Sequence, residues 1–274
     1  MKIADNLEML ALSMNVMGRE RIVYPTLIWD DDHVLLIDTG IPSNLETIKK
    51  QMEVAGVSFA NLNVIIATQQ DIDHIAGIKG ILSEKPEVMV LAHEADKPYI
   101  QGDKKVKRLN TEFMNRIKDL PEEEQLRIVD MFENANVKVN TILTDGEVLP
   151  YCGGITVIHT PGHTPGHICL YHQRSKTLIA GDALNILHGQ LVGPNEDPMT
   201  EDGVNADDAI NALKKLTNYD IQNIITYHGG LFNDIPNEKI KEVIRDRKLY
   251  SYRKSLALPV FSSGKDRCMK CAVG

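Results

Sequence analysis

The 274-residue sequence predicts an α/β fold in which strands and helices are mixed along the whole chain. Apolar runs of strand length alternate with amphipathic stretches of helix length, a pattern typical of sheets layered with helices. Hydrophobic residues make up 43% of the chain and charged residues 25%, the balance of an ordinary globular protein. No Ser- or Pro-rich linker divides the sequence. We therefore expect a single domain over residues 1–250 and a tail over residues 251–274.

The first part of the chain predicts a strand pair followed by alternating helices and strands. A turn of three aspartates joins the first two strands. Ser43 is a suitable N-cap for the next helix, and Glu46, three residues later, completes a capping box. Strands are expected over residues 21–30, 33–40, 62–68 and 87–93, with helices over residues 43–56 and 75–85.

A long polar segment over residues 94–135 predicts helices only, because no strand pattern interrupts it. Pro121 stands where one of these helices should begin, directly before the sequence EEEQLRIVDMF. We expect this helical insertion either to lie over the edge of the site and shape its pocket or to pad one face of the fold. Further strands are expected over residues 137–143, 155–160, 167–172, 177–182 and 223–228, with helices over residues 205–216 and 236–250.

The formal net charge of −8 argues against a nucleic-acid-binding protein, which would carry a basic stripe. The N-terminal sequence lacks the basic region and apolar core of a signal peptide, and no apolar run is long enough to span a membrane. We expect a cytoplasmic protein that acts on a small-molecule substrate, without nucleic-acid or membrane partners. Assembly into a homodimer stays open.

The four cysteines fall into two pairs of different character. Cys152 and Cys169 lie in strand-like surroundings, where we expect them to be small buried hydrophobic residues. Cys268 and Cys271 form a CxxC motif near the end of the sequence, and no second pair of zinc ligands lies near them. We expect this segment to be a reduced tail, and a special role for it stays open.

Four predicted strands deliver candidate metal ligands at their C-terminal ends. In a layered α/β fold, such strand ends can share one edge of the sheets, where metals and small molecules bind. Histidine nitrogens and carboxylate oxygens are the usual protein ligands of zinc, iron and manganese. The candidate ligands are, in chain order, Gln69, Asp71, Asp73, His74, His163, Asp182 and His228.

Each of these residues, taken alone, has a simpler explanation. A single histidine at a strand end is usually a hydrogen-bonded structural residue, Asp73 could cap the next helix, and Asp182 could belong to a turn. Four independent strands would have to place such groups together by accident, so we favour a metal site. Side-chain alternation along an extended loop would point Gln69, Asp71 and Asp73 to one side and His74 to the other. One loop could then serve two ions, with Asp182 between them.

Four motifs, TQQDIDHIAG, TPGHTPGH, AGDALN and ITYHGG, follow one another along the chain. On these motifs the chain resembles the metallo-β-lactamase-fold hydrolase superfamily, in its glyoxalase II-like and lactonase-like branch. The first motif is similar to the family's T-H-x-H-x-D-H-x-G-G loop, and the second is almost unchanged. The resemblance covers about residues 20–230 and implies an αββα sandwich, in which two sheets face each other and helices lie outside.

The resemblance also implies how the ligands divide between two metal ions. The first site would use His163 with the residues at positions 69 and 71, and Asp182 would bridge the two ions. The family places histidine at both positions, where this chain has Gln69 and Asp71. The second site would use Asp73, His74 and His228.

The two replaced histidines change the chemistry that we expect at the first site. A carboxylate is a harder ligand than imidazole and shifts preference from zinc toward iron or manganese, and the Gln69 amide is a weak ligand. Three carboxylates and a bridging hydroxide would cancel the charge of two divalent ions, so the centre should acidify its water less than usual. We hypothesise either a two-metal site with a loosely held first ion or a single ion at Asp73, His74, His228 and Asp182.

The function predicted from these residues is metal-dependent hydrolysis. Metal-activated water would attack an ester, a thioester or a lactone-like small molecule. Asp73 is the candidate catalytic residue, as the group that orients the water or accepts a proton. One or two divalent ions are expected, with zinc as the first candidate and iron or manganese as alternatives. The alternative functions are a diiron-type redox protein and a ligand-binding member of the fold whose catalytic power Gln69 has weakened.

Overall fold

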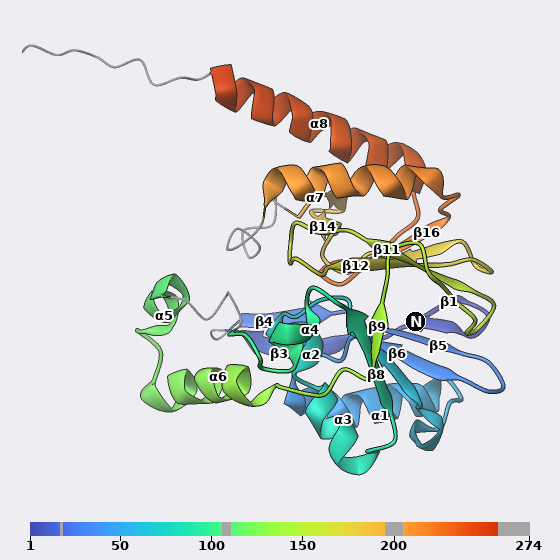
Figure 1. Ribbon diagram of the computed structural model, residues 1–274, viewed down its shortest axis with the longest axis vertical. Helices are drawn as coiled ribbons and strands as arrows, with labels where there is room; N and C mark the ends of the chain where they lie inside the picture. The colour runs from blue at the N-terminus through green and yellow to red at the C-terminus, as the bar shows by residue number, and fades with distance from the viewer. Residues whose placement is uncertain (17–18, 106–110, 195–204, 257–274) are drawn as a thin grey trace, which may run out of the picture.

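Two β-sheets face each other, and helices cover their outer faces (Figure 1). The computed structural model describes residues 1–16, 19–105, 111–194 and 205–256. Helices α1 (Leu45–Val54) and α3 (Ile78–Glu84) cover the first sheet, and α7 (Ala206–Leu213) and α8 (Pro236–Leu256) cover the second. The predicted αββα four-layer sandwich is confirmed. Among the described helices, none is both long and apolar enough to cross a membrane.

The first sheet has seven strands in the order β1-β2-β5-β6-β7-β8-β9. Strands β6 to β9 run parallel, whereas β5 pairs antiparallel with β6 as the predicted hairpin. The strands are β1 (Lys2–Ala4), β2 (Leu7–Met9), β5 (Thr26–Trp29), β6 (Val34–Ile37), β7 (Val64–Ile66), β8 (Met89–His93) and β9 (Thr141–Leu143).

The strand predicted over residues 21–30 is two strands that belong to different sheets. β4 (Arg19–Val23) pairs with β3 (Leu12–Val16) in a separate two-stranded ribbon, and β5 starts only at Thr26. Pro25 lies between them and has no backbone N–H to continue a ladder of hydrogen bonds. The sequence prediction was wrong here because it read through this proline.

The second sheet has six strands in the order β10-β11-β12-β13-β16-β17. Strand β12 is antiparallel to both β11 and β13, and β16 is parallel to β13, so β11, β13 and β16 all run in one direction. The strands are β10 (Val148–Leu149), β11 (Ile155–His159), β12 (Ile168–His172), β13 (Thr177–Ile179), β16 (Asn223–Thr226) and β17 (Gly230–Phe232). A separate pair consists of β14 (Asn185–Leu187) and β15 (Gln190–Val192).

Side-chain alternation along the strands builds three buried layers. In β6, Leu35 and Ile37 point between the two sheets, whereas Leu36 packs toward the outer helices with Ile48 of α1. A third apolar cluster joins the outer face of the second sheet to α7 and α8. Because a shift of one residue would exchange the two faces of a strand, this burial fixes the register. The strand ends, and the residues that follow them, are therefore held at defined places.

The start of α1 differs from the sequence prediction. Ser43 lies inside a short 3₁₀ helix (Pro42–Asn44), and Asn44 is the residue that precedes α1. The Asn44 side chain accepts a hydrogen bond from the Ile41 backbone N–H at 3.0 Å and donates to the Ser13 carbonyl at 2.8 Å. The predicted capping box of Ser43 and Glu46 is therefore wrong, because the helix begins later than its sequence pattern indicates.

The described part of the segment over residues 94–135 is helical, as predicted, with α4 (Lys97–Ile100), α5 (Thr111–Ile117) and α6 (Glu122–Asn134). Pro121 directly precedes α6. In Figure 1, α5 and α6 lie at the left of the molecule, whereas α4 and α2 (Ile72–Ile75) lie nearer its centre.

The cysteine predictions can be followed for one of the two pairs. Cys152 and Cys169 are buried, and burial raises the pKa of both thiols to about 12, so they stay protonated. The closing helix α8, predicted over residues 236–250, continues to Leu256. Cys268 and Cys271 lie outside the described residues, as does most of the predicted tail.

Candidate metal centre

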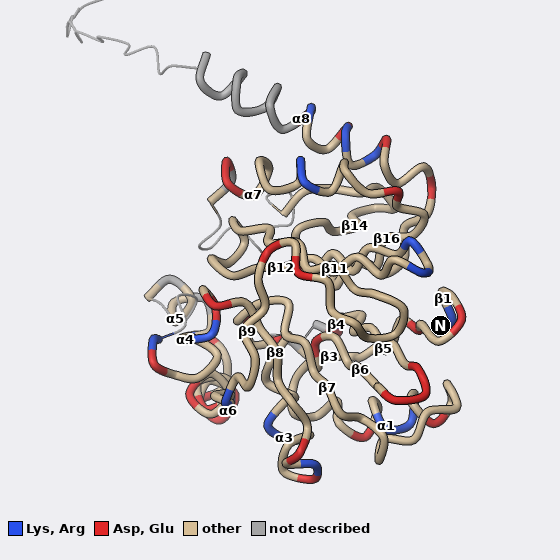
Figure 2. Tube along the Cα trace, turned by 45° about the vertical axis from the view of Figure 1, so that its right-hand side comes forward, with Lys and Arg blue, Asp and Glu red and all other residues tan. Residues whose placement is uncertain are grey.

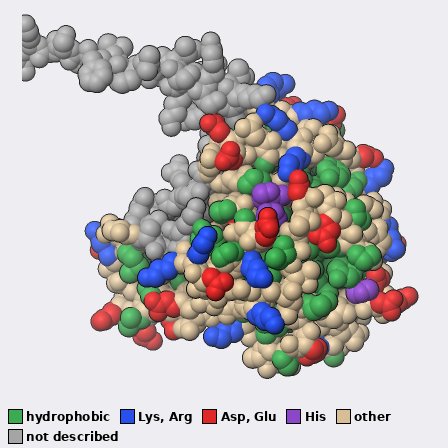
Figure 3. All heavy atoms as spheres, viewed as in Figure 1, with side chains coloured by type: hydrophobic (Ala, Val, Ile, Leu, Met, Phe, Trp, Pro, Cys, Tyr) green, Lys and Arg blue, Asp and Glu red, His purple; other side chains and the backbone are tan. Residues whose placement is uncertain are grey.

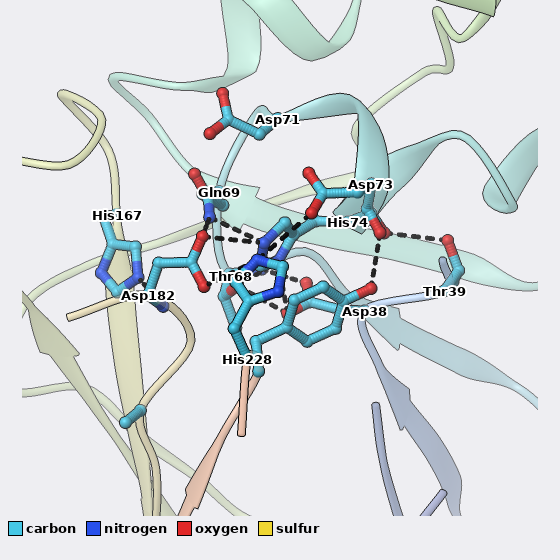
Figure 4. Close-up of polar contacts among 12 residues, drawn as sticks. Asp38, Thr39, Thr68, Gln69, Asp71, Asp73, His74, His167, Asp182 and His228 are labelled. Carbon is cyan, nitrogen blue, oxygen red and sulfur yellow. Dashed lines mark hydrogen bonds and ion pairs between the residues drawn. The ribbon is translucent and has the colours of Figure 1, made fainter. Parts of the chain in front are cut away.

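The ends of β7, β11, β13 and β16 meet at one edge of the sandwich. The loop after β7, continuing into α2, carries four of the candidate ligands, and the residues that follow the other three strands carry one each. Hydrogen bonds and ion pairs connect these side chains across the two sheets (Figure 4). The structure thus brings together all seven predicted residues, namely Gln69, Asp71, Asp73, His74, His163, Asp182 and His228.

One group of ligand atoms consists of Asp71, His163 and Asp182, all of which are buried. His163 Nε2 lies 3.1 Å from Asp71 Oδ2 and 3.2 Å from Asp182 Oδ2. One ligand atom from each residue can be chosen so that all three lie within 4.8 Å of one another. Two atoms at this distance could also share one cation at about 2 Å from each.

A second group consists of Asp73, His74 and His228. His228 Nε2 lies 3.3 Å from Asp73 Oδ2 and 3.5 Å from Asp182 Oδ1. The other Asp182 oxygen, Oδ2, lies 3.2 Å from His74 Nε2. Asp182 therefore contacts both groups, as the bridging role implied by the family resemblance requires. That these residues bind metal stays a prediction.

The loop after β7 does not place its side chains as predicted. Alternation would point Gln69, Asp71 and Asp73 to one side, but Asp71 joins the first group and Asp73 joins the second together with His74. Asp71 is the residue before α2, so the chain turns helical directly after it. Alternation applies to extended backbone only, and neighbouring helical residues instead differ by about 100° in direction.

Asp38, which the sequence analysis missed, and Tyr227 fix the orientation of the His74 ring. Asp38 follows β6, and its Oδ2 lies 2.9 Å from His74 Nδ1 and accepts the Thr68 hydroxyl at 2.7 Å (Figure 4). Its other oxygen accepts the Thr68 backbone N–H at 2.8 Å. The Tyr227 ring stacks on the His74 ring with the centroids 3.8 Å apart, and this tyrosine is buried, as core residues are. Together these contacts fix the ring so that Nε2 faces the ligand cluster.

His167 fixes the position of Asp182 in a similar way. The Asp182 backbone N–H donates to His167 Nε2 at 2.9 Å, so this nitrogen carries a lone pair and His167 Nδ1 carries the proton toward the Thr160 hydroxyl at 2.8 Å. Burial, together with the nearby His163, lowers the pKa of His167 to about 3, which keeps the ring neutral. His167 is thus a hydrogen-bonded structural residue, and one of its partners is Asp182.

Asp96, after β8, ties together the two loops that form the first ligand group. Its carboxylate accepts the Gln70 backbone N–H at 3.0 Å, the Thr164 hydroxyl at 2.6 Å and the Gly166 backbone N–H at 2.6 Å. Burial raises the pKa of Asp96 to about 6, although these hydrogen bonds act to lower it. Gln70 lies between Gln69 and Asp71, and Thr164 follows His163, so Asp96 sets the distance between the two ligand loops.

Replacing Asp96 with asparagine is expected to weaken metal binding at the first group by about 10–100-fold, because an amide NH₂ would face the donors that the carboxylate now accepts. The matched control is Asp30→Asn. Asp30 lies in the turn between β5 and β6. It also accepts three backbone N–H groups, from Asp32, His33 and Cys152. Titration calorimetry with Zn²⁺ and Mn²⁺ measures the metal affinity of both variants. Equal losses of affinity in the two variants would contradict a positioning role for Asp96.

The charges in the cluster are strongly coupled. Burial acts to raise the pKa of Asp73, but the His74 and His228 rings outweigh it and hold that pKa at about 2. Burial acts to lower the pKa of His228, but Asp182 and Asp73 outweigh it and raise that pKa to about 10. In the absence of metal, His228 is therefore protonated at neutral pH and occupies the second group as a cation.

Metal binding at the second group is expected to release protons, because an ion can reach His228 Nε2 only after that nitrogen loses its proton. Since the pKa of His228 is about 10, the apparent affinity should rise with pH between 6 and 9, by up to about tenfold per unit for each proton displaced. Titration calorimetry at pH 7 in two buffers of different ionisation enthalpy counts the released protons. Binding without proton release would show that the metal ion does not displace the proton on His228 Nε2.

The residues present fit divalent metal ions. Gln69 Oε1 is buried and has no hydrogen-bond partner among the described residues. Buried oxygens without donors are costly to maintain unless a cation or water satisfies them. Three imidazoles and three carboxylates supply the nitrogen and oxygen donors that Zn²⁺, Fe²⁺ and Mn²⁺ take in proteins.

An αββα sandwich with two ligand groups that share one carboxylate defines a class of metal-binding proteins. The sequence matches the profile of the Metallo-beta-lactamase superfamily over residues 18–228, and the chain belongs to this superfamily. A metallo-beta-lactamase family protein from Thermus thermophilus has a similar structure, with a TM-score of 0.66 and 22% identity over 94% of this chain and 85% of that protein.

Three curated relatives show the same relationship in sequence. The uncharacterized protein YobT of Bacillus subtilis is 26% identical over 228 residues, which are 81% of this chain and 89% of the relative. The probable metallo-hydrolase YflN of the same organism is 29% identical over 154 residues, 55% of each chain. A hydroxyacylglutathione hydrolase of Francisella philomiragia is 24% identical over 164 residues, 59% of this chain and 47% of the enzyme. The chain thus spans about half the length of the last two. The superfamily and these names indicate a metal-dependent hydrolase.

Proposed function

We propose that the chain is a metal-dependent hydrolase that acts on a small ester, thioester or lactone. The observation that carries this proposal is the placement of Asp182, whose two oxygens face the histidines of both ligand groups within 3.5 Å. A shared carboxylate is what a site for two adjacent ions requires. Divalent ions bound there would polarise a carbonyl group and make water a better nucleophile.

Substrate would approach from the side of the second ligand group. The side chains of Asp73 and His228 are 26% and 27% exposed, whereas those of Asp71, His163 and Asp182 are at most 4% exposed. A carbonyl group can therefore reach the second group from solvent, while the first group lies deeper. This arrangement supports Asp73 as the residue nearest to the reacting atoms.

Asp73 is suited to orienting water. Its low pKa, held at about 2 by the two neighbouring imidazoles, keeps the carboxylate ionised and makes it a weak proton acceptor at neutral pH. It can accept a hydrogen bond from water and so aim a lone pair of the water at the carbonyl carbon. Of the two roles that the sequence suggested, orientation is therefore favoured over proton transfer.

The substrate class follows from the relatives and from the surface charge. One relative is named for the hydrolysis of a glutathione thioester, so a thioester is the first candidate. Lysine and arginine alternate with aspartate and glutamate along the described chain and over the face seen in Figure 3, without forming a basic stripe there (Figures 2 and 3). A small uncharged or weakly anionic acyl compound fits such a surface better than a nucleic acid does.

The oxygen-rich ligand set also supports a second candidate. Three carboxylates with three imidazoles suit iron and manganese as well as zinc, so diiron-type redox chemistry remains the alternative function. Zinc is proposed first because hydrolysis needs no change of oxidation state.

The test is hydrolysis by protein that has been stripped of metal and reloaded separately with Zn²⁺, Mn²⁺ or Fe²⁺. The substrates are an acyl-glutathione thioester, a lactone and an aryl ester, and the Asp73→Asn variant, with the same metal content, is the control. We expect metal-dependent turnover of at least one acyl compound, reduced at least about tenfold in the variant. Metal-loaded protein that hydrolyses none of the three, or equal turnover by the variant, would refute the proposal.

A further inference from the structure

The Gln69 side chain lies at the centre of the ligand cluster and is buried. Its Nε2 atom is 2.7 Å from Asp182 Oδ2 and 2.8 Å from His74 Nε2 (Figure 4). The atom that approaches a carboxylate oxygen this closely must be the NH₂ group, because an amide oxygen there would face another lone pair. This NH₂ group donates to Asp182 and lies against His74 Nε2.

The same NH₂ group also faces the Nε2 side of the His74 ring. His74 Nδ1 lies 2.9 Å from Asp38 Oδ2, which leaves Nε2 as the ring nitrogen that faces Gln69. His74 Nε2, the atom that would bind a metal ion, is already occupied by a hydrogen-bond donor from the chain itself.

We propose that the Gln69 carboxamide is an internal substitute for a cation: its NH₂ group joins His74 to Asp182 in the metal-free protein, and an ion must displace it to bind the second ligand group. The related motif has histidine at this position. A histidine nitrogen that binds a metal ion uses its lone pair and cannot also donate a hydrogen bond to Asp182. The inference concerns the centre on which the proposed function rests, but its test needs no substrate.

The Gln69 side chain presents its oxygen to one ligand group and its nitrogen to the other. Figure 4 shows the Gln69 oxygen on the side of Asp71 and its nitrogen on the side of Asp182 and His74. This oxygen has no hydrogen-bond partner among the described residues. An ion at Asp71, His163 and Asp182 would meet an oxygen lone pair, whereas an ion at His74 would meet N–H groups. The first group should therefore fill before the second, the reverse of the loosely held first ion that the sequence suggested.

The decisive variant is Gln69→Met, which keeps the length of the side chain and removes both the donor and the acceptor. With the NH₂ group gone, the second ion should bind about tenfold more tightly, because it no longer displaces a charge-assisted hydrogen bond. The melting temperature of the metal-free protein should fall, since His74 and Asp182 lose their link. The matched control is Gln51→Met in α1, which removes an amide that exchanges hydrogen bonds with the Ala11 backbone outside the cluster and should leave the affinity unchanged.

Titration calorimetry with Zn²⁺ and Mn²⁺, together with calorimetric melting of the metal-free proteins, measures both effects. Weaker binding of the second ion by Gln69→Met would show that Gln69 is an ordinary ligand and would overturn the proposal. Because neither measurement uses turnover, failure of the hydrolase assay and failure of this inference are separate results.

Discussion

The Asp182→Ala variant is expected to lose both metal ions and to lower kcat/KM by about 10³-fold on any substrate that the protein hydrolyses. The reason is that Asp182 contacts histidines of both ligand groups. Its Oδ2 lies 3.2 Å from both His74 Nε2 and His163 Nε2, and its Oδ1 lies 3.5 Å from His228 Nε2. Without this carboxylate, three imidazoles would face two cations with too few negative charges to hold them.

Metal content measured by plasma mass spectrometry, alongside turnover, checks this prediction. Asp220→Ala is the matched control, because Asp220 is 70% exposed and pairs only with Lys176 on the surface. The control should bind the same number of ions as the wild-type protein and melt within about 2 °C of it, since surface ion pairs contribute little. An Asp182→Ala protein that folds and still holds two ions would contradict the role given to this residue.

The Asp38→Asn variant is expected to lower metal affinity by about 10–100-fold and to destabilise the fold by about 2–4 kcal/mol. Asparagine keeps the volume of the side chain and tolerates the left-handed backbone of Asp38, where φ is 60°. It replaces one carboxylate oxygen with an NH₂ group, which would face either the Thr68 donors or the proton on His74 Nδ1. A buried donor would then be left without an acceptor, and the His74 ring would lose the partner that fixes it.

Urea unfolding of the metal-free proteins gives the stability change, and metal titration of the folded proteins gives the affinity. The two readouts separate a purely structural residue from one that positions a ligand. A variant that loses stability but binds metal as tightly as the wild-type protein would show that Asp38 supports the core and not His74.

The candidate ligands of this site could be predicted from the sequence because they follow a local pattern. A buried strand followed by polar residues is visible at Gln69, His163, Asp182 and His228, and parallel strands bring such ends to one edge. The same pattern, an apolar run that ends in aspartate, also occurs at Asp38 and could have marked it as a partner of the cluster.

The residues that position the ligands were harder to find. Asp96 contacts Gly166, 70 residues away, and Asp38 contacts His74, 36 residues away, and no periodicity in the sequence encodes these pairs. The strand over residues 21–30 was wrong because Pro25 was overlooked, whereas the other two wrong predictions have local backbone geometry as their cause. The start of α1 after Asn44 and the helical turn after Asp71 depend on how the chain packs, and side-chain spacing alone does not report them.

Metal binding at this site is tested most directly by anomalous scattering from crystals grown with Zn²⁺ or Mn²⁺ and measured at the absorption edge of each metal. We expect a peak among Asp71, His163 and Asp182, and at higher metal concentration a second peak among Asp73, His74 and His228, each about 2.0–2.3 Å from its ligand atoms. Crystals saturated with either metal that show no peak at either group would contradict the claim that these residues gather around divalent ions.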